Sequence, residues 1–184
     1  PADHPKREFV DIIKEETSRL NNIVAAFLKF ARPASPSMQL TSVGELIDST
    51  LTLLKKEAEA SRVNLEVHHA SSLPAIRLDP DQIRQVLLNI VLNGIQAMPA
   101  GGRVEVRSSY RDSDRSVIIE VSDTGNGQPP EDLDQLFDPF YTTKPHGTGL
   151  GLSISYQLVH NHKGNLTVRR NDQGGLTFGI SLPL

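Results

Sequence analysis

The chain lacks cysteine and tryptophan, and its positive charges do not exceed its negative charges. Its 184 residues contain no Cys, and 19 Lys and Arg face 22 Asp and Glu. The absence of Cys excludes disulfides, thiolate metal sites and a cysteine nucleophile, and it suits a reducing compartment. The chain also lacks the basic field that sequence-independent binding to DNA or RNA requires, so we expect no nucleic-acid partner.

Long apolar runs are missing as well. No stretch approaches the roughly 18 residues of a membrane span, and no apolar core follows a basic start as in a signal peptide. We therefore expect a cytoplasmic chain, with any membrane anchor of the parent protein in upstream segments. The chain opens Pro1-Ala2-Asp3 without Met, and we interpret it as a fragment of a longer protein.

Residues 6–32 have the pattern of one long amphipathic helix. The apolar residues recur at three- and four-residue steps, and they are Phe9, Ile12, Ile13, Leu20, Ile23, Val24, Phe27, Leu28 and Phe30. The pattern stops before Pro33, and the residues after it have linker composition. One helix cannot bury its own apolar stripe, so we expect it to pack on an upstream helix, on the following domain or on a second copy.

The rest of the chain alternates between helical and extended patterns. Helices are expected at 43–61, 80–98 and 153–162, and strands at 63–69, 75–78, 103–110, 116–122, 165–170 and 176–182. This order predicts an α+β fold, a two-layer α/β sandwich in which helices cover one face of a mixed, mostly antiparallel sheet.

Two groups of glycines suggest a nucleotide pocket. Gly125 and Gly127 form one group, and Gly147, Gly149 and Gly151 form the other. Glycines at two-residue spacing expose backbone N–H groups to phosphate oxygens or to a flat ring. The second group runs into an expected helix, whose N-terminal amides favour an anion. Tight turns also use glycine, so each group alone is weak evidence, and neither matches a Walker or Rossmann motif.

The helix expected at 80–98 carries a polar stripe beside its apolar face. Asp79 has the features of an N-cap, with Pro80 at the first helical position. Gln85, Asn89 and Asn93 are spaced by four and lie on one side. Because Asn is a poor residue within a helix, the stripe needs a reason. It is either a solvated face or a source of amide oxygen for Mg²⁺ carried by a nucleotide.

Four motifs then occur in order, at residues 89–98, 123–127, 137–144 and 147–152. They read Asn-Ile-Val-Leu-Asn-Gly-Ile-Gln-Ala-Met, Asp-Thr-Gly-Asn-Gly, Phe-Asp-Pro-Phe-Tyr-Thr-Thr-Lys and Gly-Thr-Gly-Leu-Gly-Leu. They resemble the N, G1, F and G2 boxes of the catalytic, ATP-binding domain of two-component sensor histidine kinases, which have the Bergerat fold of the GHKL family. The first helix resembles the second helix of that family's dimerisation and phosphotransfer hairpin. The resemblance implies a partial hairpin at 1–33, a linker at 34–40 and a catalytic domain at 41–184.

The resemblance also implies roles for individual residues toward ATP or ADP and Mg²⁺. Asn93 would ligate Mg²⁺, and Asp123 would accept a hydrogen bond from the adenine amino group, since a carboxylate offers only acceptors. Asn89 would lie beside the phosphates, and Lys144 would meet the terminal phosphates; these two are the expected catalytic residues. The remaining implied nucleotide-binding residues are Gly125, Gly127, Thr142, Thr143, Gly147, Thr148, Gly149, Leu150 and Gly151.

Three positions depart from the family pattern. Gln128 stands where an apolar residue is usual, and Lys163 stands where Gly is common. Gly94 replaces the usual Ala and should weaken its helix by roughly 1 kcal/mol unless a close contact requires it. None of these changes removes an expected ligand.

The resemblance implies transfer of the γ-phosphoryl group to a histidine on a hairpin helix, and then to an aspartate of a response regulator. It also implies a homodimer formed through the hairpin. We find no acceptor histidine in this chain, since His68 and His69 fall in an expected strand, and His160 and His162 are interpreted as ordinary surface residues. We therefore expect a chain that binds Mg·ATP without phosphorylating itself.

Two other classes of function remain open. Gyrase, Hsp90 and MutL-type ATPases share the fold but place a Glu four residues before the Mg²⁺ ligand. Asn89 occupies that position here, and an amide cannot activate water. The other class is a nucleotide-binding regulatory module, such as a pseudokinase or an anti-sigma-like regulator, that transfers no phosphate.

Overall fold

The structure is a computed structural model that describes residues 9–14, 16–17, 20–21, 24, 28, 35–126, 129–144 and 147–184. Its elements after the first segment are β1 Gln39–Thr41, α2 Val43–Ala60, β2 Val63–His69, β3 Ile76–Leu78, α3 Pro80–Gln96, β4 Gly102–Arg111, β5 Ser116–Asp123, η1 Leu133–Phe137, α4 Gly151–Asn161, β6 Asn165–Arg170 and β7 Leu176–Pro183. All expected helices and strands of this part are present, with ends shifted by no more than about two residues. β1 and the short helix η1 were not anticipated.

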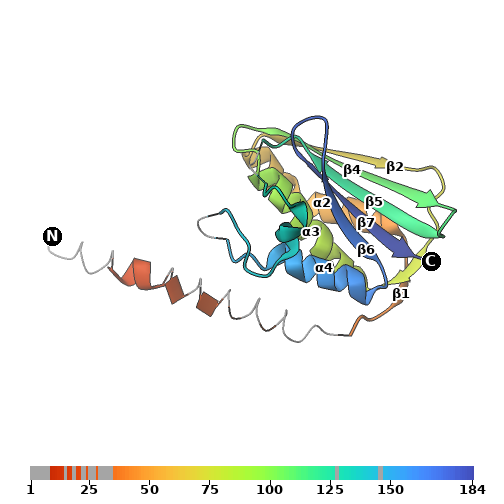
Figure 1. Ribbon diagram of the computed structural model, residues 1–184, viewed down its shortest axis with the longest axis horizontal. Coiled ribbons are helices and arrows are strands. Elements are labelled where there is room, and N and C mark those ends of the chain that lie inside the picture. The colour runs from red at the N-terminus through yellow and green to blue at the C-terminus, as the bar shows by residue number, and fades with distance from the viewer. Residues whose placement is uncertain are drawn as a thin grey trace.

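The five-stranded sheet has the order β2-β4-β5-β7-β6. β2 and β4 are parallel, and the other three pairs are antiparallel. β3 does not join this sheet, because it pairs with β1 in a separate antiparallel ribbon. Figure 1 shows α2, α3 and α4 together on one side of the five strands. The expected α+β sandwich with a mixed, mostly antiparallel sheet is therefore confirmed.

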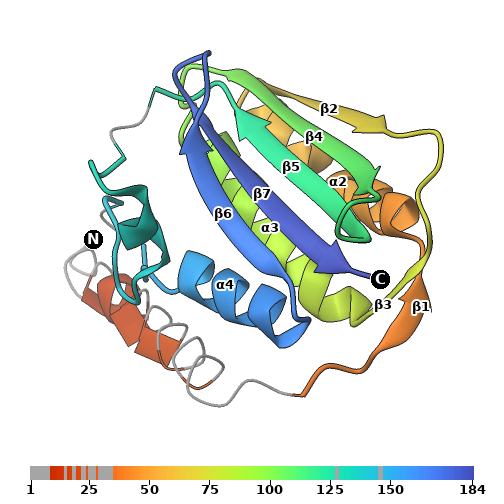
Figure 2. The ribbon, with the colours of Figure 1, turned by 45° about the vertical axis from the view of Figure 1, so that its right-hand side comes forward.

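The core lies between the sheet and these helices. In β4 and β5 every second residue points inward, and α3 contributes the apolar stripe that meets them. The fully buried side chains include Ile83, Leu87, Ile90, Val104, Ile119 and Ile180. Burial of each such side chain contributes about 1.5–3 kcal/mol. In Figure 2 the strands lie in front of α3, with their other face turned away from the helices.

The start of α3 is held by the predicted cap. Asp79 Oδ1 accepts hydrogen bonds from the backbone N–H groups of Asp81 and Gln82, at 3.0 and 3.1 Å. Its Oδ2 accepts from the N–H of Ser37 at 2.7 Å, which ties the segment before β1 to this helix. Burial alone would raise the pKa of the Asp79 carboxyl, but these backbone donors outweigh it and lower the pKa.

His162 corrects a prediction, because it is buried rather than a surface residue. It lies just after α4, and 4% of its surface is exposed. Its Nε2 accepts a hydrogen bond from the backbone N–H of Asp79 at 2.9 Å, so Nδ1 carries the proton and donates to the Leu158 carbonyl at 2.8 Å. The neutral imidazole thus joins the end of α4 to the start of α3. His160 is exposed, as expected.

The described residues of the first segment are helical and exposed. Phe9, Ile13 and Leu20 are each at least 60% exposed, so these side chains do not pack on the described residues within 35–184 of the same chain. Ile23, Phe27 and Phe30 lie outside the described residues. Among the residues that are described, no helix has both the length and the apolarity needed to cross a bilayer.

Candidate nucleotide-binding site

A pocket of about 300 Å³ lies beside α3. Its wall is formed by the last turns of α3, the end of β5, the segment between η1 and α4, and the β6–β7 hairpin. Ten of the predicted site residues line it: Asn93, Asp123, Gly125, Thr142, Thr143, Lys144, Gly147, Thr148, Gly149 and Gly151. Tertiary structure thus brings residues of all four sequence motifs into the wall of one cavity.

Asp123, the last residue of β5, is buried at one end of this pocket. Its Oδ1 accepts hydrogen bonds from the backbone N–H groups of Gly125 and Leu176, at 2.9 and 3.4 Å. No described residue donates a hydrogen bond to Oδ2. Burial raises the pKa of the Asp123 carboxyl, and the two N–H donors only partly oppose it. The carboxylate can therefore accept a hydrogen bond from a donor in the pocket.

Two glycines allow other segments to approach Asp123 closely. A Cβ at Gly175 would overlap the Asp123 backbone carbonyl, and a Cβ at Gly94 would lie 3.3 Å from the Asp123 Cβ. Asn171 fixes the same place, since its Nδ2 donates to the Asp123 carbonyl at 2.8 Å. Gly94 therefore has the close contact that would justify a glycine within α3.

Asn93 and Lys144 meet directly in the pocket. The Lys144 Nζ donates to Asn93 Oδ1 at 2.7 Å and to Gln96 Oε1 at 2.6 Å. Burial lowers the pKa of the Lys144 amine. The amide oxygen predicted to ligate Mg²⁺ is therefore aimed at the position of a cation, and Lys144 is held by α3 rather than free in solvent.

Asn89 lies outside the set of residues that line the pocket. Its Nδ2 donates to the Gly151 carbonyl at 3.1 Å and to Ser155 Oγ at 3.2 Å, so it joins α3 to the first turn of α4. Leu150 is fully buried under that turn, also off the pocket wall. Gly127 and Gln128 lie outside the described residues.

The segment before α4 is fixed by a close backbone contact. The N–H of Phe140 donates to the Gly149 carbonyl at 2.9 Å. Gly149 has φ +67°, and a Cβ there would overlap the Phe140 backbone, so this position requires glycine. Phe137 packs on Tyr156 and Phe178, with ring centroids 5.3 and 6.5 Å apart. These contacts connect the third motif to α4 and β7.

Sequence reasoning missed several residues of the wall, which are Gln96, Ala97, Pro129, Pro130, Leu136, Tyr141, Gly174, Leu176 and Phe178. Gln96 could have been found, since it follows Asn93 by one helical turn. Gly174 and Gly175 gave only a turn signal, because nothing in the local sequence says that this hairpin folds over Asp123.

Comparison with known proteins agrees with this geometry. Residues 78–184 match the family described as Histidine kinase-, DNA gyrase B-, and HSP90-like ATPase. The chain is 34% identical over 184 residues to the sensor histidine kinase ZraS of Salmonella typhimurium, covering 100% of this chain and 39% of ZraS. It is thus well under half the length of that relative.

Solved structures give the same assignment. The chain matches full-length ShkA in complex with AMPPNP with a TM-score of 0.83 and 28% identity, over 96% of this chain and 38% of ShkA. It matches the histidine kinase ThkA in complex with the response regulator TrrA with a TM-score of 0.80 and 25% identity, over 100% of this chain and 52% of that chain. The chain therefore belongs to the histidine kinase-, DNA gyrase B- and HSP90-like ATPase family, and its ATP-binding domain is of the sensor histidine kinase type.

Proposed function

We propose that this chain is the ATP-binding catalytic part of a histidine protein kinase of the two-component type. It transfers the γ-phosphoryl group of ATP to a histidine on a hairpin helix outside this chain, for relay to an aspartate of a response regulator. The observation that carries the proposal is that one pocket combines the Asp123 carboxylate, the Asn93 amide oxygen and the Lys144 amine. These groups suit the base, the metal and the phosphates of Mg·ATP respectively.

Adenine recognition rests on Asp123. Its Oδ1 is occupied by two backbone N–H groups, so Oδ2 accepts from the exocyclic amine of adenine. Gly125 and Gly175 keep the space beside it free of side chains. A guanine base presents a carbonyl oxygen at the corresponding position, which would face a carboxylate. The pocket should therefore prefer ATP and ADP to GTP and GDP.

The residues at Asn93 fit Mg²⁺. The amide oxygen is a hard, neutral ligand of the kind Mg²⁺ accepts when phosphates supply the rest of its shell. That oxygen already accepts from the cationic group of Lys144, so its surroundings favour positive charge. When bound, Mg²⁺ neutralises charge on the β- and γ-phosphates.

The phosphates are received by Lys144 and by backbone N–H groups of the glycine-rich segment before α4. Lys144 binds as a point charge. Thr142, Thr143, Gly147, Thr148 and Gly149 surround it in the pocket wall. Asn89 acts as a positioning residue, because its bond to the Gly151 carbonyl holds the first turn of α4 against α3.

The proposed chemistry is transfer to an imidazole rather than hydrolysis. Among the described residues that line the pocket, Asp123 is the only carboxylate, and it faces the adenine end. The position four residues before Asn93 holds an amide committed to Gly151 and Ser155. None of the described pocket residues is therefore a base that could activate water near the terminal phosphate, and ATP persists until the histidine of the hairpin arrives.

The partners follow from the same proposal. ThkA, which this chain resembles, forms a complex with a response regulator, and we propose a receiver domain of that kind as the partner here. The exposed helical residues that the structure describes between Phe9 and Leu28 would contribute to a hairpin bundle with an upstream helix and a second copy.

The test uses γ-labelled ATP and Mg²⁺ with the chain alone and with an added dimerisation hairpin of the parent protein. We expect acid-labile label on the hairpin, none on the chain, and negligible release of phosphate from the chain alone. A steady ATPase rate without the hairpin would instead favour the gyrase and Hsp90 class. Binding of Mg·ATP with no transfer to the hairpin would favour a regulatory module.

A further inference from the structure

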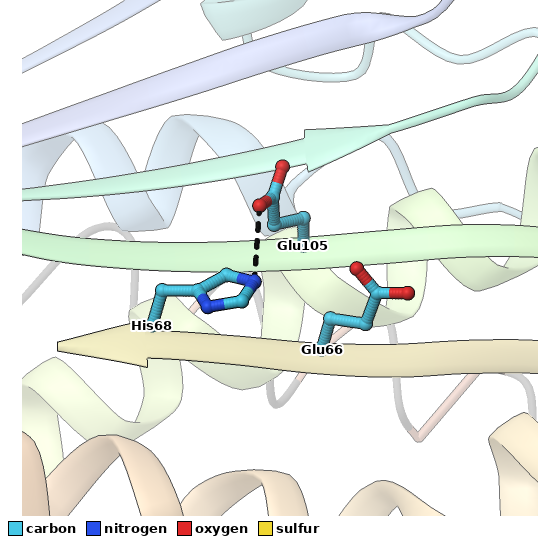
Figure 3. A group of neighbouring side chains, drawn as sticks. All are labelled: Glu66, His68 and Glu105. Carbon is cyan, nitrogen blue, oxygen red and sulfur yellow. Dashed lines mark ion pairs between the residues drawn. The ribbon is translucent and has the colours of Figure 1, made fainter.

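The outer face of the sheet carries three metal-ligating side chains close together. Glu66 and His68 lie on β2, Glu105 lies on β4, and the parallel register sets Glu66 directly opposite Glu105. Because residues two apart on a strand share a face, His68 projects on the same side. Figure 3 shows His68 of β2 reaching toward Glu105 of β4, with Glu66 beside them on β2. The nucleotide pocket lies on the opposite, helix-covered side.

The distances suit a single ion. One ligand atom from each of the three residues lies within 4.8 Å of the other two. The His68 Nε2 and Glu105 Oε1 are 3.3 Å apart. Bonds of 2.0–2.1 Å in a tetrahedral zinc site place neighbouring ligand atoms about 3.3 Å apart. His68 and Glu105 therefore already span one edge of such a site, and Glu66, with an oxygen within 4.8 Å of both ligand atoms, is the third ligand.

We propose that Glu66, His68 and Glu105 form a binding site for a divalent transition-metal ion such as Zn²⁺, with water in the fourth position. An imidazole nitrogen with two carboxylates selects ions of this class over Mg²⁺ and Ca²⁺, which prefer oxygen ligands alone. The site is separate from the nucleotide pocket and needs no group from it.

Neighbouring arginines compete with the ion for the carboxylates. The Arg107 Nη2 lies 2.8 Å from Glu105 Oε1, and the Arg103 Nη1 lies 3.7 Å from Glu66 Oε2. The Arg107 side chain is 64% exposed, so solvent screens its ion pair with Glu105 and the pair is weak. Arg107 can leave Glu105 for solvent at little cost when a metal ion binds.

A neighbouring side chain already orients one of the proposed ligands. The Asn64 Nδ2 donates to Glu66 Oε1 at 2.8 Å, which orients that carboxylate. Glu66 and Glu105 together supply two negative charges, which offset the charge of a divalent ion.

The test is a calorimetric titration of the full chain, free of nucleotide, with ZnCl₂. The variants are His68→Gln, Arg107→Gln and, as a matched control, His160→Gln, which removes an exposed histidine of α4. Removal of a ligand should weaken zinc binding by about tenfold or more, and loss of Arg107 should tighten it. The control should bind zinc as the unaltered chain does. Thermal melts check that each variant is folded.

Three results would overturn the proposal: no heat of binding with the unaltered chain, equal affinity in the chain with His68→Gln, or an equal loss in the control. Because sites elsewhere could also take zinc, the ¹H–¹⁵N signals of the His68 ring give a second readout. They should shift on addition of ZnCl₂ and stay in place with MgCl₂, and a His68 ring that ignores zinc would equally overturn the site.

Discussion

The Lys144 amine lies 2.7 Å from the Asn93 amide oxygen, the atom that we propose as the protein ligand of Mg²⁺. Lys144 belongs to the segment before α4, whereas Asn93 belongs to α3. A cation bound at Asn93 and the Lys144 ammonium therefore compete for one oxygen. Nucleotide binding should move Lys144 from α3 onto the phosphates, which would draw the segment before α4 toward the ligand.

The first prediction concerns Lys144. Lys144→Ala should weaken binding of Mg·AMPPNP by about 10- to 100-fold, because a hydrogen bond to a charged group contributes about 1.5–3 kcal/mol. Mg·ADP, which lacks the terminal phosphate, should lose less. Calorimetry measures both affinities, with Lys55→Ala on the exposed side of α2 as the control.

The pH dependence of the same contact follows from burial, which lowers the Lys144 pKa below its ordinary 10.5. The affinity for Mg·AMPPNP should therefore begin to fall with rising pH below pH 10.5, as the amine loses its charge.

The second prediction separates stability from binding at Asp123. In Asp123→Asn the Oδ1 can still accept from Gly125 and Leu176, but an NH₂ group replaces Oδ2 and faces the adenine amine. ADP affinity should therefore fall at least tenfold, at about 1.4 kcal/mol per factor of ten, while the free energy of unfolding stays equal or rises. A variant with unchanged affinity for ADP would contradict the assignment of the adenine end.

The pH dependence at Asp123 has a definite sign. Its pKa is raised in the folded chain above the ordinary 3.8, so the unfolded chain releases this proton first. The contribution of Asp123 to stability is therefore full below pH 3.8 and is lost as pH rises through the folded-state pKa. Urea unfolding should show the advantage of Asp123→Asn growing with pH over that window.

The third prediction concerns the hairpin over Asp123. Gly175→Ala would place a Cβ against the Asp123 carbonyl, and both segments are backbone that cannot easily yield. We expect a loss of about 1–3 kcal/mol in the free energy of unfolding, together with weaker ADP binding. Gly44→Ala in α2 is the comparison, because a Cβ at Gly44 comes no closer than 3.9 Å to the His69 ring. It should leave ADP binding unchanged and should not lower the free energy of unfolding.

The fourth prediction concerns the buried imidazole of His162. His162→Ala would leave the Asp79 N–H and the Leu158 carbonyl without their side-chain partner. The expected loss is about 1–3 kcal/mol for an unsatisfied buried donor, with a further cost from the cavity. His160→Ala, on the exposed side of α4, should change the free energy of unfolding by less than about 0.5 kcal/mol. Chemical denaturation measures both free energies of unfolding, and equal values for the two variants would contradict the role of His162.

The fifth prediction concerns assembly through the first helix. Ile13 and Leu20 are 62% and 60% exposed, and burying such side chains between helices contributes about 1.5–3 kcal/mol each. We expect concentration-dependent association in sedimentation velocity, and its loss in Ile13→Asp. Glu16→Asp, which keeps the charge of that helix, should associate as before. If the chain sediments as a monomer at all concentrations, the first helix does not by itself drive association.

Much of the secondary structure could be predicted because its causes are local. Asp79 and Pro80 start α3 through a side-chain cap and a fixed φ, and the alternation in β4 follows from the period of a strand. β1 escaped prediction because three residues of mixed polarity carry no periodic signal. His162 was misjudged for a related reason, since only the packing of α4 against α3 brings its ring to the Asp79 N–H.

Local patterns were enough to predict most of the helices and strands, the four motifs and the chemical types of the site residues, because propensity, capping and residue chemistry act over a few positions. Folding in three dimensions was needed to show that Lys144 contacts Asn93, that Asn89 contacts α4 rather than lining the pocket, and that the β6–β7 hairpin packs behind Asp123. Those relations join residues about 50 or more positions apart. They depend on strand register and helix packing, which no local pattern encodes.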